Sequence, residues 1–421
     1  MKRLRLYLAN VARSILMYRQ FPPPLGILSL ASFLRSRFDL DIRVVNQRAE
    51  RCSSEEVAKR AIEFGADIVG LGCLTPSGHE MPHLTQWVRE GLPSVLIVLG
   101  GPHVTASGAA SMEATFADAA VPGEGELSLE AIVRAWFEGD GDLSGIPGIF
   151  WRSKDGEIIT NPGTTAVVED LDSLPLPAYD LIDLRLYWKS LSFTPIAFRR
   201  YLSVMTSRGC PFHCNYCQHV LGTRWRAYSA PRIVEEIKHC VDAYGVDTIE
   251  VLDDVFNLDT ERVFAFSELA VRENLKVNLT FPNGVRSDIM TPEVIDALVS
   301  AGMDQCTFAL ESGSPRIQKA MGKRLNIARY PERGMGRGSR RLHARVQHAW
   351  IPYRDPGGRP SNHFHCLKFR PSHGQFLHGH AISEHRFVPR RSTCGAREIG
   401  GSGLPRHGVH QPAREPLGYA G

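Results

Sequence analysis

Short apolar runs alternate with amphipathic segments along the first 140 residues. Apolar runs of this length predict buried β-strands, whereas apolar residues spaced three or four apart predict α-helices. Ser53 and Glu56 have the spacing of a capping box, which predicts another helix start. Strands that alternate with helices predict a doubly wound parallel sheet, so the expected fold class is α/β. The expected strands are residues 4–9, 41–46, 66–74 and 94–101, and the expected helices are residues 25–38, 82–92 and 126–136.

The pattern changes between residues 141 and 200. Alternating apolar residues flank Asp155-Gly156, a pair that favours a β-hairpin turn. An extended stretch with Pro175 and Pro177 follows, and prolines of this kind stiffen linkers between domains. The sequence therefore predicts a hairpin and a proline-rich connector over residues 141–200.

A second alternation of strands and helices runs from residue 201 to residue 327. Polar residues stand at the ends of its strands, which is where the sites of βα barrels form. The sequence therefore predicts a partial barrel of about four βα units. The expected strands are residues 201–206, 247–259, 276–288 and 305–314, and the expected helices are residues 229–245 and 291–303.

The composition of the 421-residue chain is that of a globular protein, with 43% hydrophobic and 22% charged residues. These values exclude a collagen-like or wholly disordered chain, and the length allows two or three domains. No apolar run approaches about 18 residues, the length that a membrane-spanning helix needs. Nine cysteines are too few for a disulfide scaffold, and no secretory signal is recognisable. We therefore expect a cytoplasmic protein, with Cys73 and Cys306 as buried packing residues in apolar strands.

The net charge of +4 conceals two unlike parts. Residues 328–421 hold 16 Lys+Arg and 5 Asp+Glu, a charge of +11, which leaves 33 and 40, a charge of −7, for residues 1–327. The basic part has no alternation of strands and helices, so we expect an irregular tail. Its enrichment in Arg, Gly, Pro and His favours an out-of-frame translation of GC-rich DNA. The alternatives are a nucleic-acid appendage, disfavoured by its scattered arginines, and a metal site, disfavoured by the absence of ligand spacing among its histidines. The histidines concerned are His363, His365, His373, His378 and His380.

Three cysteines with the spacing C-x3-C-x2-C follow the strand expected at residues 201–206. Cys210, Cys214 and Cys217 place three thiols in one loop, and thiolates are the ligands of iron–sulfur clusters. Three ligands leave one iron of a four-iron cluster open to another molecule. A zinc site with His213 or His219 as fourth ligand, or a redox role, is the competing interpretation. Because structural zinc sites more often use paired C-x2-C motifs, we interpret the loop as a cluster site.

Glycine-containing loops follow three strands of the first sheet, at Thr75–His79, Gly100–Thr105 and Gly123–Glu126. Open α/β sheets bind ligands beyond the carboxyl ends of their strands. Glycines let the backbone approach a flat or phosphorylated ligand closely. Any one of these loops alone would be interpreted as a tight turn. Three of them at successive strand ends predict a ligand cleft.

The strand, the string RGCPFHCNYC and the helix after it resemble the radical SAM enzymes. The strings GGPHVT and GEGE, with the PPPLG start of the first helix, resemble the cobalamin-binding domain that precedes many of these enzymes. The resemblance covers about residues 1–327, and the cysteine motif carries it most specifically. Classical cobalamin domains ligate cobalt through a His in an Asp-x-His-x-x-Gly loop, which this chain lacks. His79 and His103 are the imidazoles available there, and we expect each to be a loop or helix-start residue rather than a ligand.

This resemblance implies a Rossmann-like cobalamin-binding domain at residues 1–140 and, after the connector, a partial radical SAM barrel at residues 201–327. Barrels of the family have six βα units, so residues 328–421 stand where further strands belong. The implied cofactors are a [4Fe–4S] cluster, S-adenosylmethionine and cobalamin. For the carboxylates, helix N-capping is the structural alternative. The implied cluster ligands are Cys210, Cys214 and Cys217; the S-adenosylmethionine residues are Tyr216, Asp253, Asp254, Glu311 and Ser312; the cobalamin residues are Thr75, Ser77, Gly100, Gly101, Pro102, His103, Gly123, Glu124, Gly125 and Glu126.

The resemblance further implies an enzyme that cleaves S-adenosylmethionine on the cluster to a 5′-deoxyadenosyl radical. With cobalamin, such an enzyme methylates an unactivated carbon of a small molecule, using an electron donor such as flavodoxin or ferredoxin. Oxidative ring closure of a porphyrin ester is the alternative reaction, and no motif here separates the two. A non-catalytic, degenerate cobalamin-binding chain is a further alternative, because the barrel is incomplete. No membrane span is expected, and nucleic acid ranks last among the partners.

Overall fold

The computed structural model describes residues 3–12, 22–190, 192–193, 200–309, 311–312, 314–326 and 343–347. The histidine-rich segment from His363 to His380 lies outside the described residues, so its metal-site and nucleic-acid interpretations stay predictions. Among the described residues, no helix has the length and apolar character needed to cross a membrane.

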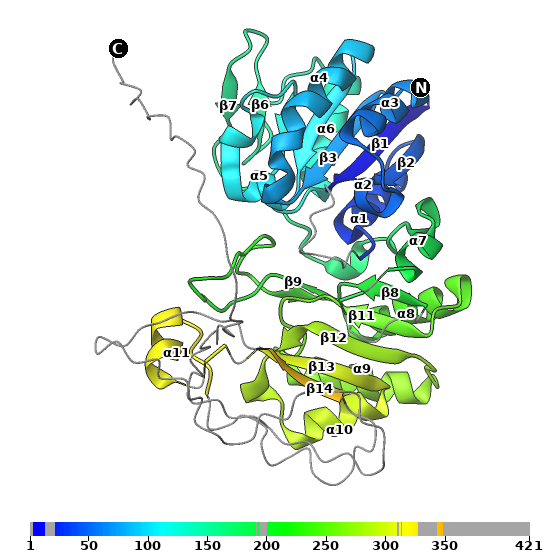
Figure 1. The fold of residues 1–421 in the computed structure, drawn as a ribbon, viewed down its shortest axis with the longest axis vertical. Coiled ribbons are helices and arrows are strands. Elements are labelled where there is room, and N and C mark those ends of the chain that lie inside the picture. Colours follow the sequence, from blue (N-terminus) through cyan, green and yellow to red (C-terminus); the bar gives the residue numbers. More distant parts are fainter. Residues whose placement is uncertain are drawn as a thin grey trace, which may run out of the picture. The chain divides into compact units, whose positions relative to one another are not determined.

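A seven-stranded sheet forms the first part of the fold (Figure 1). Its strands lie in the order β2-β1-β3-β4-β5-β6-β7, and the first five are parallel. The order reverses beside β1, which is the arrangement of a doubly wound sheet and confirms the α/β prediction. The strands are β1 (Leu4–Val11), β2 (Leu40–Asn46), β3 (Ile68–Cys73), β4 (Leu96–Gly100), β5 (Ala119–Ala120), β6 (Phe150–Arg152) and β7 (Ile158–Thr160).

Successive residues of β1 alternate between two hydrophobic cores. Leu6 and Leu8 pack with the apolar sides of α1 and α6, whereas Tyr7 and Ala9 pack with those of α3 and α4. A strand buried on both faces needs apolar residues at every position, which is why it reads as an unbroken run. Ser53 accepts a hydrogen bond from the Glu56 N–H and caps α3, as predicted. The helices are α1 (Leu25–Arg35), α2 (Gln47–Glu50), α3 (Ser54–Phe64), α4 (Met81–Gly91), α5 (Pro102–Ser107) and α6 (Glu126–Phe137).

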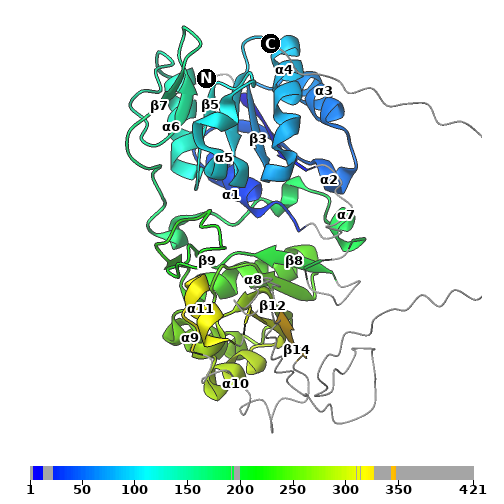
Figure 2. The ribbon, with the colours of Figure 1, turned by 60° about the vertical axis from the view of Figure 1, so that its left-hand side comes forward.

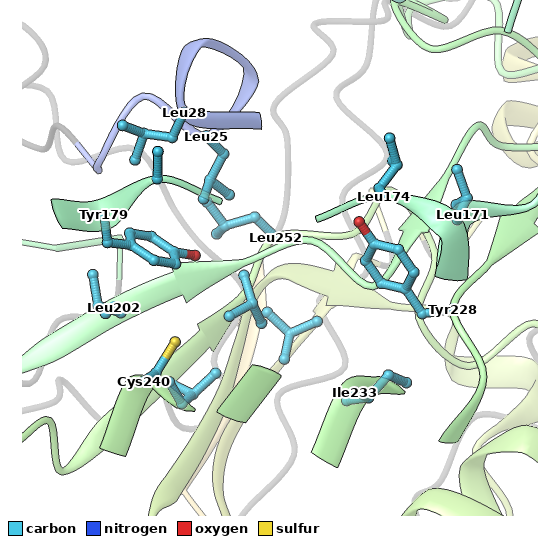
Figure 3. Close-up of a cluster of buried hydrophobic side chains, with 14 of the residues drawn as sticks. Leu25, Leu28, Leu171, Leu174, Tyr179, Leu202, Tyr228, Ile233, Cys240 and Leu252 are labelled. Carbon is cyan, nitrogen blue, oxygen red and sulfur yellow. The ribbon is translucent and has the colours of Figure 1, made fainter. Parts of the chain in front are cut away.

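The connector begins with the predicted hairpin, in which β6 and β7 pair antiparallel around Asp155-Gly156. It continues through short turns and α7 (Leu184–Trp188). Tyr179 of the connector lies in a buried apolar cluster with Leu28 of α1 and Leu202 of β8 (Tyr201–Val204), as Figure 3 shows. The Tyr179 hydroxyl donates to the Ser203 carbonyl at 2.6 Å. At Tyr179 the connector is therefore packed into the core rather than exposed as a free linker.

A five-stranded sheet, all parallel, forms the second part of the fold in the order β14-β13-β12-β11-β8. Helices α8, α9 and α10 pack side by side against it, as Figures 1 and 2 show. This is the partial βα barrel that the sequence predicted. The strands are β8 (Tyr201–Val204), β11 (Thr248–Val251), β12 (Asn278–Val285), β13 (Met303–Ala309) and β14 (His343–Gln347), and the helices are α8 (Ala230–Tyr244), α9 (Thr260–Arg272), α10 (Pro292–Ser300) and α11 (Pro315–Met321).

Three of these elements differ from the sequence prediction, and one of them is α11, which follows the last predicted strand. Helix α9 was not anticipated, although Asp259 caps it by accepting from the Arg262 N–H. The expectation of an irregular tail over residues 328–421 is wrong at β14, which adds a fifth parallel strand beside β13. Five residues with a single valine are too short for a pattern to show, and strand pairing is made by the backbone.

Candidate functional site

The cysteine motif lies in the loop between β9 (Ser207–Arg208) and β10 (Arg226–Ala227), residues 209–225, which we call the cysteine loop. Antiparallel strands β9 and β10 pair at its two ends. Within it, the Cys210 N–H donates to the Gly222 carbonyl at 3.2 Å. Gly209 enters the loop with φ 83°, in the left-handed region that favours glycine. A Cβ there would lie 2.4 Å from the Arg224 carbonyl oxygen, so only glycine fits where the two sides of the loop meet.

Helix α11 holds the middle of this cysteine loop. The Asn215 N–H donates to the Met321 carbonyl at 2.9 Å, and its side-chain amide donates to the Ala320 carbonyl at 2.8 Å. Gly322, at the end of α11, has φ 69°, and a Cβ on it would lie 2.6 Å from the His213 carbonyl oxygen. The loop between the first and third cysteines is therefore fixed by a helix more than 100 residues later.

Cys210, Cys214 and Cys217 are free thiols; the first two are half-buried and the third is exposed. Burial is the main cause that raises the pKa of the Cys210 and Cys217 thiols. A cluster would bind these residues as thiolates, so its binding would release their protons. In the described part of the chain, no three His, Cys, Asp or Glu side chains lie close enough together to hold a single metal ion. The three thiols lie on one loop, and their residue type is the one that iron–sulfur clusters take as ligands.

Three side chains meet beside the cysteine loop. The Lys323 ammonium lies 3.3 Å from a Glu311 carboxylate oxygen, and both side chains are about nine-tenths buried. Burial, followed by the charge of Glu311, raises the pKa of Tyr216. Tyr216 and Glu311, both assigned from the sequence, are thus brought together, and Lys323 is a residue that the sequence did not reveal. Its charge lowers the pKa of Cys217 against the larger, raising effect of burial.

Glu311 has φ 62°, an unfavourable conformation for a residue with a side chain. Strain of this kind persists where the surroundings over-determine a residue, and it gathers at functional sites. The next residue, Ser312, is held by two hydrogen bonds: its hydroxyl accepts from the Ser314 N–H, and its carbonyl accepts from the Gln318 side-chain amide at 2.6 Å. The strained turn aims the Glu311 carboxylate at Lys323 and toward the cysteine loop.

The two aspartates after β11 have different environments. Asp253 is buried, and it accepts hydrogen bonds from Thr206 and Ser207, which directly precede the cysteine motif. Asp254 is exposed at the surface, but neighbouring atoms still cover part of its carboxylate. This partial burial and the charge of Asp253 raise its pKa, and His219 lowers it by less. The charge of Asp254 also raises the pKa of Cys210. Asp254 therefore faces the cysteine loop, whereas Asp253 neither caps a helix nor has a carboxylate free for a ligand.

The loops assigned to cobalamin lie together at the carboxyl ends of β3, β4 and β5. Thr75 begins a 3₁₀ turn that contains the buried Ser77, and a Cβ on Gly78 of that turn would lie 2.5 Å from the His103 ring. Gly101 follows the strand-terminal Gly100 with φ 82°, and Pro102 starts α5. A hydrogen bond connects the second loop to the third: the Gly123 N–H donates to Thr105 Oγ1 at 2.9 Å. Gly123 has φ 70°, and Gly125 is the N-cap residue of α6.

The structure gives the Glu124 and Glu126 side chains a role that the sequence did not predict. Glu126 accepts from Arg208 at 2.7 Å, and Glu124 accepts from Arg208 at 2.8 Å and also from Arg226. All four side chains are at most 9% exposed. Burial lowers the pKa of Arg208, but Glu126 and Glu124 raise it more. The carboxylates of Glu124 and Glu126 are thus paired with the arginines at the two ends of the cysteine loop. The loop Gly123–Glu126 therefore offers a cofactor its backbone rather than these two side chains.

His79 and His103 both contact residues close to them in the sequence. The His79 Nδ1 lies 3.0 Å from the Pro76 carbonyl, and its Nε2 lies 3.1 Å from Glu80. The His103 Nδ1 lies 3.2 Å from the Ser107 hydroxyl. His79 thus lies in the 3₁₀ turn after β3 and His103 in the first turn of α5, as expected for a loop and a helix-start residue.

Two families match this chain: the B12 binding domain over residues 16–133 and the Radical SAM superfamily over residues 204–331. The chain belongs to the cobalamin-binding radical SAM family. The cofactors of this family are cobalamin, S-adenosylmethionine and a [4Fe–4S] cluster. The resemblance inferred from the cysteine motif and the glycine loops is thereby confirmed.

An uncharacterized methyltransferase of Pyrococcus horikoshii is 33% identical over 304 residues, which are 72% of this chain and 63% of that protein. An anaerobic magnesium-protoporphyrin IX monomethyl ester cyclase of Rubrivivax gelatinosus is 25% identical over 298 residues, 69% of this chain and 52% of that protein. The chain thus spans less than two thirds of the length of either relative.

Among solved structures, the cobalamin-dependent S-adenosylmethionine radical enzyme OxsB, with aqua-cobalamin and S-adenosylmethionine bound, matches with a TM-score of 0.68. The match has 19% sequence identity and covers 82% of this chain and 49% of that one. At this identity it shows that the two chains share a fold.

Proposed function

We propose that this protein is a cobalamin-dependent radical SAM methyltransferase that acts on a small molecule. The observation that carries the proposal is the rigid cysteine loop, held by α11 beside Tyr216, Glu311 and Lys323. The same chain presents three glycine loops at the ends of a doubly wound sheet, where such sheets bind their ligands. One chain therefore supports both the cluster and the cobalamin sites.

Each residue has a defined task in this proposal. Cys210, Cys214 and Cys217 would hold three irons of the cluster, which leaves the fourth for S-adenosylmethionine. Glu311 and Ser312 would bind polar groups of that ligand, and the ring of Tyr216, 42% exposed, would pack on its adenine. The backbones of Gly101 and Gly123 and the side chains of Thr75 and Ser77 would line the cobalamin site.

The bound cofactors supply one-electron cleavage of a carbon–sulfur bond and a cobalt centre that carries a methyl group. The protein's own task is to orient and enclose them. The Glu311–Lys323 pair keeps two opposite charges together in a site only about one-tenth exposed, so that the carboxylate is already oriented when a cationic ligand arrives. Asp254 adds negative charge near Cys210 and Cys217.

Methyl transfer is preferred to oxidative ring closure because the 33% identical relative carries a methyltransferase name, whereas the cyclase relative is 25% identical. The cluster chemistry needs a one-electron donor, for which a flavodoxin or ferredoxin is the expected class. A reducing cytoplasm is the expected setting, because three accessible thiols must stay unoxidised before they bind iron.

Anaerobic reconstitution of the full chain tests the proposal. We expect about four irons per chain, as one [4Fe–4S] cluster requires, and one bound cobalamin. Cys210→Ala should lose the iron and keep the cobalamin, whereas Cys52→Ala, a half-buried cysteine of the other domain, should keep both. Formation of 5′-deoxyadenosine from S-adenosylmethionine under reducing conditions is the next readout. Cobalamin without iron in the parent chain would instead support the degenerate, non-catalytic alternative. A parent chain that binds neither cofactor would refute the proposal.

A further inference from the structure

Four buried charges join the loop after β5 to the cysteine loop. Arg208 Nη1 and Nη2 donate to Glu124 and Glu126 at 2.8 and 2.7 Å, and Arg226 donates to Glu124. Two arginines and two glutamates make a neutral set in which every charge has an opposite partner. Buried charges are costly unless they are paired in this way. We call these four side chains the arginine–glutamate clasp.

The positions of the arginines decide what the clasp can do. Arg208 lies two residues before Cys210, where the chain enters the cysteine loop. Arg226, where the chain leaves the loop, is paired with Arg208 in the β9–β10 ladder. The fork of each arginine therefore holds one end of the cysteine loop. Guanidinium groups bind carboxylates with fixed direction as well as strength, which lysine does not do.

The glutamates are connected in turn to the glycine loops. Gly123 directly precedes Glu124, and its N–H donates to Thr105 in the loop after β4. A Cβ on Gly123 would lie 3.9 Å from the Val220 carbonyl oxygen, three residues beyond Cys217. The loop Gly123–Glu126 thus contacts both ends of the cysteine loop while it is bonded to the neighbouring glycine loop.

We propose that the arginine–glutamate clasp is a positioning device that sets where the cysteine loop lies relative to the glycine loops. The inference rests on the proposed function, because it gives these residues the task of fixing the distance and angle between the cluster and the cobalt. Glu124 and Glu126 then act through Arg208 and Arg226 and touch neither cofactor. A misplacement of about 1 Å is enough to matter in such a site.

Substitutions at Glu126 test the clasp, with the full chain in each experiment. Glu126→Gln removes one charge and leaves Arg208 with a weaker partner, whereas Glu126→Asp keeps the charge and shortens the reach. Glu130→Gln is the matched control: it makes the same change on the next turn of α6, in a pair with Arg134 at the surface. Arg208→Lys is a second test, which keeps the positive charge but loses the two-pronged contact.

The first measurement is amide hydrogen exchange of the cofactor-free chain. We expect exchange in residues 207–222 to rise about tenfold or more in Glu126→Gln, because one charge loses its buried partner. The increase should be smaller in Glu126→Asp and absent in Glu130→Gln. Unchanged exchange in Glu126→Gln and Arg208→Lys would overturn the clasp. This readout needs no cofactor, so it is independent of whether the proposed function holds.

The second measurement is the magnetic interaction between a reduced cluster and cob(II)alamin, observed by electron paramagnetic resonance of the loaded protein. In Glu126→Gln, and in Arg208→Lys if the first variant does not fold, we expect an altered splitting at unchanged iron and cobalamin content. A clasp that only stabilises the fold would change the cofactor content or melting temperature but leave the splitting as in the parent, which would overturn the positioning role. A parent chain that takes up no cofactor would refute the proposed function and leave the exchange result as the test.

Discussion

Asp253 accepts two hydrogen bonds from Thr206, one from its backbone N–H and one from its hydroxyl, each at 2.6 Å. Ser207 donates a third to the same carboxylate at 2.6 Å. A buried carboxylate with three donors and Arg262 at 3.9 Å is a structural anchor for the strand end that leads into the cysteine loop.

Removal of this anchor should damage both the fold and the cluster site. We expect Asp253→Ala to lower the free energy of unfolding by about 3 kcal/mol, because it leaves Arg262 and two hydroxyls buried without their partner. Iron content should fall with it, since Thr206 and Ser207 precede Cys210. Asp254→Asn, at an exposed site, should leave stability within about 0.5 kcal/mol. Urea unfolding and iron analysis measure both, and equal effects of the two substitutions would contradict this assignment.

Gly209 should tolerate no side chain. Gly209→Ala places a Cβ 2.4 Å from the Arg224 carbonyl oxygen in addition to the strain of its positive φ. Backbone atoms cannot move aside cheaply, so we expect the loop to open and the chain to lose its iron. Gly156→Ala in the β6–β7 hairpin is the matched control, with φ 87° and open space around the added carbon. It should cost about 1–2 kcal/mol through φ alone and retain iron. Full iron content in Gly209→Ala would refute the prediction.

Glu311 allows backbone strain and side-chain chemistry to be separated. Glu311→Gln keeps the strained backbone and loses the charge, so binding of S-adenosylmethionine to the reconstituted chain should weaken about 10- to 100-fold. Glu311→Gly also removes the charge that pairs with Lys323, but it relieves the strain at φ 62°, so its fold should be up to about 1 kcal/mol more stable than that of Glu311→Gln. Equilibrium binding and thermal unfolding provide the two measurements. A Gln variant that binds as tightly as the parent would exclude Glu311 from the site.

Glu236 predicts a pH dependence of stability. It is fully buried on α8, and burial raises its pKa from 4.5 to about 7 despite the opposing charge of Arg232. Because the folded state holds the proton more tightly than the unfolded state, the wild type loses stability relative to Glu236→Gln as the pH rises from about 4.5 to about 7. The loss should total up to about 3 kcal/mol and level off above that range. Urea unfolding of both chains across this pH range measures the difference, and a difference independent of pH would contradict the shift.

Several features of the fold were readable from local sequence. Unbroken apolar runs predicted β1, β3 and β4, because a strand buried on both faces needs apolar side chains at each position. The spacing of Cys210, Cys214 and Cys217 predicted the cluster loop, because three thiolates within a few residues have few other uses. Helix α9 was missed although its cap at Asp259 is regular and its sequence follows directly on the strand predicted at residues 247–259.

Partner choice was not readable in the same way. Glu124 was assigned to cobalamin from its glycine loop, yet its partners Arg208 and Arg226 lie 84 and 102 residues away. Lys323 carries no local motif, and the short strand β14 has almost no apolar pattern. By itself, the sequence determined the class of fold, the cluster loop and the edges of the sheets that carry the site, because these depend on the chemistry of neighbouring residues. Only the tertiary structure decided which carboxylates hold the protein together and which face the cysteine loop, because burial and pairing arise when distant segments pack.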